Sequence, residues 1–151
     1  MGFFTGKKKQ NNEKALSKIA DTGSNDTLQN GSDTSDLLSR MVSRTAKVIT
    51  VSEYEKEFFL AFERALQCEG LPVANFNAER MSSGSIRVDS SWGIIGTVHL
   101  RRKFGSIQYL ISVMDIHDMD DAPVEAVIAV IPYWISYSKA LISLYQAATR
   151  V

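Results

Sequence analysis

The sequence predicts an α+β fold: an N-terminal helix, a small antiparallel sheet of three to four strands, and a long C-terminal helix packed on the sheet. Two observations support this order. Residues 122–151 carry apolar side chains at spacings of three and four, which is typical of a helix with one buried face. Residues 73–114 instead alternate apolar and polar side chains between turns that contain glycine, which is typical of antiparallel strands.

The composition of the 151 residues fits one soluble domain with a tail. Lys+Arg and Asp+Glu both number 17, and a net charge of zero argues against a strongly basic nucleic-acid-binding protein. The single cysteine fits a reducing compartment and excludes an intramolecular disulfide. We find no secretory signal, and the longest uncharged stretch, residues 126–138, is shorter than the roughly 20 residues of a bilayer span. We therefore expect a cytoplasmic protein.

The front of the chain is expected to precede the folded domain. Residues 1–35 are polar and basic, which predicts a disordered tail. Two phenylalanines and three lysines within residues 1–9 could touch an anionic membrane, but their small apolar area favours a solvated tail. Residues 36–51 are expected to form a short helix or a hinge. The α+β domain is placed at residues 52–151.

Residues 52–69 carry the clearest helical signal in the chain. Ser52 and Glu55 have the spacing of a capping box, in which each side chain binds the free backbone N–H of the other residue. Gly70 and Pro72 predict the end of the helix. One face of this helix is expected to carry Phe58, Phe62, Ala65, Leu66 and Glu69.

The strands are expected at residues 86–89, 96–101 and 107–113, with a short additional strand within residues 73–81. Glycine-containing turns separate them, as expected for hairpins. If the strands pair in chain order, one face of the sheet is apolar and the other is polar. The polar face would carry Arg87, Asp89, Thr97, His99, Arg101, Lys103 and Gln108.

The last part of the chain is expected to be an acidic loop, residues 115–121, followed by the long helix. Asp121 would cap this helix, Pro123 would lie in its first turn, and Pro132 should kink it. Trp134 and Tyr137 are placed on the flank of the buried stripe. That stripe comprises Val124, Val127, Ile128, Ile131, Ile135, Leu141, Ile142 and Tyr145.

The opposite side of this helix supports the leading functional hypothesis. Tyr133 and Leu144 lie there among alanines, and a helix that is apolar nearly all round is buried on both sides or lies at an interface. The first helix would cover that side in the simplest case. Alternatively, the side is exposed, and the protein is a non-enzymatic interaction module that binds another protein or itself. The predicted interface residues are Tyr133, Trp134, Tyr137 and Leu144.

Nucleic-acid binding is the first alternative. It would use the cations and the histidine of the polar sheet face to contact phosphates. The order helix, strands, helix is loosely similar to double-stranded-RNA-binding domains, but the last helix has no lysine-rich start with which to grip phosphate. The residues assigned to this alternative are Arg87, His99, Arg101, Arg102 and Lys103.

A metal-dependent enzyme is the second alternative, with Asp89 and the acidic loop holding a divalent cation. The loop lacks the central glycine and the distal glutamate of an EF-hand. One cysteine and two histidines are also too few for a structural zinc site. We therefore predict no catalytic residues, no metal ligands and no cofactor.

Three sequence runs resemble a small family of uncharacterised proteins from Gram-positive bacteria. They are GTVHLRRK at residues 96–103, SIQYL at 106–110 and PYWISY at 132–137. The resemblance covers residues 94–144. It implies a bacterial protein in which the basic strand and the aromatic helix form one recurring unit, and it assigns no activity and no functional residue.

Overall fold

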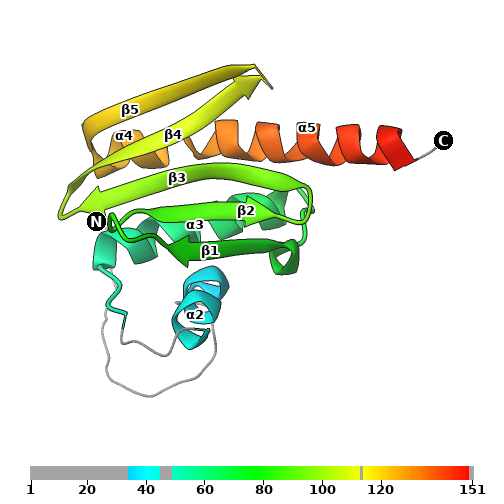
Figure 1. The fold of residues 1–151 in the computed structure, drawn as a ribbon. Coiled ribbons are helices and arrows are strands. Elements are labelled where there is room, and N and C mark those ends of the chain that lie inside the picture. Colours follow the sequence, from blue (N-terminus) through cyan, green and yellow to red (C-terminus); the bar gives the residue numbers. More distant parts are fainter. Residues whose placement is uncertain (1–33, 45–48, 113, 150–151) are drawn as a thin grey trace. The chain divides into compact units, whose positions relative to one another are not determined.

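The computed structural model describes residues 34–44, 49–112 and 114–149, which form an α+β fold (Figure 1). Its sheet is antiparallel, with the strands in the order β1-β2-β3-β4-β5. Helices α3 and α5 pack against each other, and both contact β3. The elements are α2 (Asp36–Ser43), α3 (Glu53–Cys68), the 3-10 turn η2 (Val73–Asn75), β1 (Phe76–Arg80), β2 (Ile86–Ser90), β3 (Gly93–Arg101), β4 (Phe104–Ser112), β5 (Asp115–Pro123), α4 (Val124–Ile128) and α5 (Ile131–Thr149).

The sheet has five strands, so the prediction of three to four strands was wrong. The additional strand is β5, which occupies the residues expected to form an acidic loop. It pairs with β4 from Ser112↔Asp115 to Phe104↔Pro123 and lies at the edge of the sheet. Most of its residues are exposed, and His117 and Met119 are half-buried. An edge strand of this kind tolerates aspartates because their carboxylates stay in water.

Helix α3 begins and ends as the sequence predicted. The backbone N–H of Glu55 donates to Ser52 Oγ at 3.1 Å, and the N–H of Ser52 donates to Glu55 Oε1 at 3.0 Å, so the capping box is confirmed. Gly70 follows with φ 71°, a left-handed conformation that glycine adopts without strain. The N–H of Leu71 then bonds the carbonyl of Leu66 at 2.8 Å, which closes the helix end.

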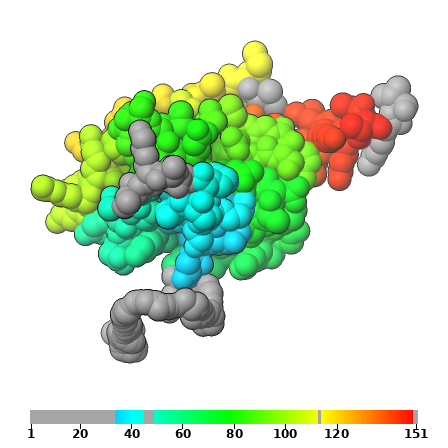
Figure 2. All heavy atoms as spheres, turned by 60° about the horizontal axis from the view of Figure 1, so that its bottom comes forward, coloured from blue at the N-terminus to red at the C-terminus, as the bar shows by residue number. Residues whose placement is uncertain are grey.

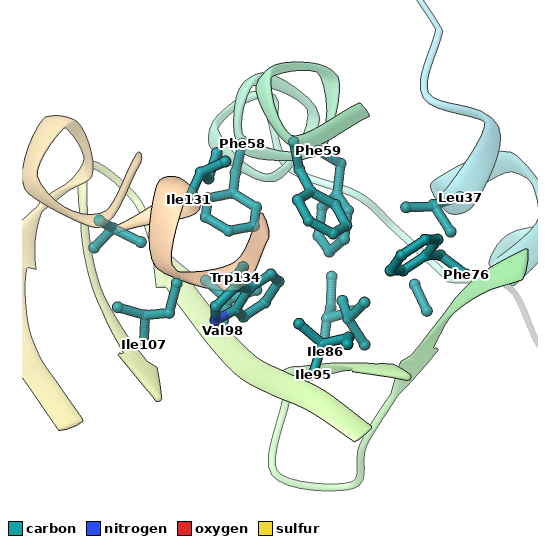
Figure 3. Packing of buried hydrophobic residues seen from close by; sticks show 14 of the residues in the cluster. Leu37, Phe58, Phe59, Phe76, Ile86, Ile95, Val98, Ile107, Ile131 and Trp134 are labelled. Carbon is teal, nitrogen blue, oxygen red and sulfur yellow. The ribbon is translucent and has the colours of Figure 1, made fainter. Parts of the chain in front are cut away.

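The hydrophobic core lies between the helices and one face of the sheet, with Trp134 at its centre (Figure 3). The Trp134 ring meets the rings of Phe58 and Phe62 edge-on, each at a centroid distance of 5.4 Å. Phe62 in turn meets Phe76 of β1 edge-on at 5.9 Å. All four side chains are fully buried. Trp134 was predicted to flank the buried stripe, and the structure corrects this placement.

The long C-terminal helix is divided into α4 and α5 by a short break at residues 129–130. Pro132 therefore lies in the first turn of α5, where its missing N–H leaves no helical bond unmade. The predicted cap at Asp121 is wrong, because Asp121 belongs to β5 and has φ 54°. Pro123 occupies the N-cap position of α4, and no side-chain hydrogen bond from the described residues caps this helix.

Helix α2 packs on β1 and is held at its start by a buried carboxylate of α3. Glu63 accepts hydrogen bonds from the hydroxyl of Ser35 and from the backbone N–H groups of Asp36 at 3.1 Å and Leu37 at 3.0 Å. A negative charge at a helix N-terminus is stabilising because the free N–H groups there carry partial positive charge. The apolar side of α2 buries Leu37, Leu38 and Met41 in the core.

Arg40 of α2 and Arg44, which follows the helix, bind backbone carbonyls beside and on β1. Arg44 Nη2 donates to the carbonyl of Ala78 in β1 at 2.6 Å, and Arg40 Nη2 donates to the carbonyl of Val73 in η2 at 3.1 Å. One carbonyl on the free edge of β1 is thereby satisfied by this chain. The predicted tail, residues 1–35, lies outside the described residues apart from its last two positions.

Candidate interaction surface

Strands β3 and β4 separate partway along their length. They pair from Arg101↔Phe104 to Thr97↔Gln108, whereas the described residues after Gln108 in β4 pair only with β5. The carbonyl of Gln108 accepts a hydrogen bond from Nε1 of Trp134 at 3.0 Å. The indole of α5 therefore lies at the point of separation, and Figure 1 shows α5 running beside the separated strands.

Gly96 of β3 makes this arrangement possible. A Cβ atom at this position would lie 2.5 Å from the carbonyl oxygen of Gln108 and 2.8 Å from Nε1 of Trp134. Real Cβ atoms are not found so close to other heavy atoms. The contact among β3, β4 and α5 thus requires glycine here.

Beyond this point the β4–β5 hairpin forms an arm, defined here as residues 109–112 and 114–117. The Tyr109 ring is stacked between Tyr133 of α5, at 5.2 Å, and His117 of β5, at 5.5 Å. Nε2 of His117 lies 3.1 Å from a carboxylate oxygen of Asp115 without the alignment of a hydrogen bond. The exposed apolar side chains of the arm are Ile111 at 52%, Met114 at 91% and Ile116 at 59% exposure.

The C-terminal half of α5 extends past the sheet as a projecting segment, defined here as residues 140–149. Figure 2 shows its red end standing away from the body of the domain. Leu144 is 52% exposed and Tyr145 is 47% exposed. Tyr145 follows Trp134 by three helical turns, so both lie on the same stripe. Nearly half of Tyr145 is nevertheless exposed, and the segment contains no charged residue.

The four predicted interface residues differ in their exposure. Tyr133 is 45% exposed, Leu144 lies on the projecting segment, and Tyr137 is half-buried against the core. Trp134 is fully buried and belongs to the core, so it offers no surface to a partner in this structure. The sequence analysis missed the contribution of the arm. The signal for it was the pair of isoleucines at the end of one hairpin, Ile111 and Ile116.

Three of the predicted nucleic-acid residues, Arg87, His99 and Arg101, lie on the polar face, and carboxylates accompany them. Arg87 Nη2 lies 2.8 Å from Glu79 of β1 and 3.6 Å from Asp89 of its own strand. Arg101 Nη2 lies 3.8 Å from Asp121 of β5. A phosphate chain would have to displace these carboxylates from the cations.

His99 lines a shallow depression of about 270 Å³ on the same face. Two of the lining residues, Asp118 and Asp120, come from β5 and make this part of the face acidic. The sequence analysis did not place them here because it read β5 as a loop. Arg102 and Lys103 are exposed in the β3–β4 turn, where Nζ of Lys103 lies 5.9 Å from the centroid of the Phe104 ring.

The described residues provide no support for the metal hypothesis. Among them, no group of three or more His, Cys, Asp or Glu residues could hold a metal ion. Asp89 faces Arg87, and the residues of the expected acidic loop are spread along the extended strand β5. Glu57 of α3 also lies near Glu125 of α4. Partial burial raises the pKa of Glu57, and repulsion from the neighbouring Glu125 carboxylate raises it further.

The stretch Val124–Thr149 is long and apolar enough to cross a membrane by length and composition. Its first half packs in the core, and a core helix of a soluble protein has the same properties.

Comparison of the chain with protein-family models, curated proteins and solved structures finds no match. The chemistry of the described surface is therefore the basis for a functional proposal.

Proposed function

We propose that this protein is a non-enzymatic protein-interaction module that binds through the projecting segment of α5 and the adjacent arm. The observation that carries the proposal is a half-exposed helix of ten residues without a single charge, residues 140–149. Exposed helices of soluble proteins carry charged residues on their solvent side. A face that lacks them is suited to burial against another protein.

The size of the apolar surface supports the same conclusion. Six large apolar side chains are exposed on the arm and on α5, and their exposed parts amount in total to on the order of 600 Å², at roughly 150–200 Å² for each complete side chain. They lie on more than one face, because Ile116 pairs with Leu110 on the side of the hairpin opposite to Tyr109, and Tyr145 is rotated by about 100° from Leu144. The six side chains are Ile111, Met114, Ile116, Tyr133, Leu144 and Tyr145.

Nucleic-acid binding has less support as a function. Two of its five residues, Arg87 and Arg101, lie beside carboxylates, and His99 shares its depression with Asp118 and Asp120. The remaining two, Arg102 and Lys103, give only a small basic surface at one turn. Weak, salt-sensitive binding that Arg102→Ala and Lys103→Ala abolish would favour this alternative.

A photo-cross-linking residue in place of Leu144 tests the interaction proposal in the full-length chain. We expect ultraviolet light to produce a covalent adduct in cells that naturally contain the protein, since Leu144 would face the partner. The same residue in place of Ser82, which is exposed in the β1–β2 turn, is the matched control and should give none. Absence of any adduct at position 144 would contradict the proposal.

A further inference from the structure

We draw no further inference here: the strongest candidate, the open edge of β5 with its four exposed aspartates, carries nothing, because carboxylates along an edge strand are equally typical of a solvated edge and nothing in the described part of the chain shows what would pair with it.

Discussion

The two edges of the sheet differ in how far the rest of the chain covers them. At β1, helix α2 packs on the strand, and Arg44 binds the backbone carbonyl of Ala78. At β4 and β5, the arm separates from β3, β5 forms an open edge, and α5 continues past the sheet with apolar side chains exposed. The β1 side is completed by this chain, whereas the α5 side presents surface that a partner could complete.

The difference lies in how each side uses polar groups. The β1 side holds the Arg80 guanidinium against the Glu55 carboxylate through bonds of 2.6 and 3.0 Å, and Glu63 binds the start of α2. Such pairs fix one geometry, because a buried charge that loses its partner is costly. The projecting segment has no such pairs, so its contacts are set by shape alone. Polar pairs thus fix the contacts within the chain on the β1 side, whereas the α5 side exposes apolar side chains.

The strongest test of the comparison replaces, one at a time, the two aromatic residues of one α5 stripe by alanine. We expect Trp134→Ala to lower the free energy of unfolding by about 3–5 kcal/mol, because it removes a buried ring that two phenylalanines contact. Tyr145→Ala should change it by less than about 0.5 kcal/mol in the dilute, single-chain state. Urea unfolding followed by circular dichroism measures both. Equal losses would mean that the end of α5 is as well covered as its start.

The next test removes the carboxylate that holds α2. Glu63→Ala should cost about 2–4 kcal/mol, because the hydroxyl of Ser35 and two backbone N–H groups lose their acceptor. Glu69→Ala is the matched control, since its salt bridge to Lys139 is exposed and worth at most about 1 kcal/mol. Hydrogen exchange should show that the amides of α2 lose protection first. Retained protection in Glu63→Ala would show that the carboxylate is dispensable.

A third test addresses the point where the sheet separates. Gly96→Ala should destabilise the fold by about 1–3 kcal/mol, because the added methyl group overlaps the Gln108 carbonyl and the Trp134 indole. We expect a change in tryptophan fluorescence as the ring is displaced. Thr97→Ala, at the next position of β3 on the polar face, should leave the fluorescence unchanged. Identical spectra for Gly96→Ala and the unmodified protein would argue against the close contact.

The smallest expected effect concerns Glu57 and Glu125. The raised pKa of Glu57 means that the folded state binds this proton more tightly than the unfolded state. The resulting stabilisation is present below the usual value of 4.5 and is lost as the pH rises through the raised pKa. Glu57→Gln should therefore raise the free energy of unfolding at pH 7 by a few tenths of a kcal/mol. The melting temperature should rise accordingly at pH 7 and stay unchanged at pH 4.

Glu53→Gln is the control for this pH effect, because the exposed Glu53 carboxylate pairs with Lys56 at 3.1 Å. It should give no stabilisation at pH 7. A stabilisation by Glu57→Gln that persisted unchanged at pH 4 would mean that the charge of Glu57 is not its cause.

Local sequence patterns were sufficient to predict helix α3 and strands β2, β3 and β4. The capping box of α3, its glycine end and the alternation in β2, β3 and β4 all appear in the structure. The failure at β5 has a physical cause, because aspartate is depleted in strands in general but is tolerated at the exposed positions of an edge strand. Composition cannot distinguish that situation from a loop.

The position of Trp134 was missed for a different reason. A single uninterrupted helix places the tryptophan on the flank of the buried stripe, whereas the break at residues 129–130 starts a new helix and rotates the ring into the core. The acceptor for the start of α2 was also beyond local prediction, because Glu63 lies 26–28 residues further along the chain. Contacts over such separations depend on the finished fold.

The carboxylate of Glu63 has a consequence for how the chain is made. An isolated helix of eight residues has little stability in water, since helices shorter than about 12–15 residues are marginal alone. Helix α2 leaves the ribosome well before Glu63, so its N-terminal N–H groups and its leucines must wait for α3 to emerge and fold. The α2 segment is thus synthesised before the carboxylate that binds its start, and a pause in translation between the two helices would leave that segment open to proteases.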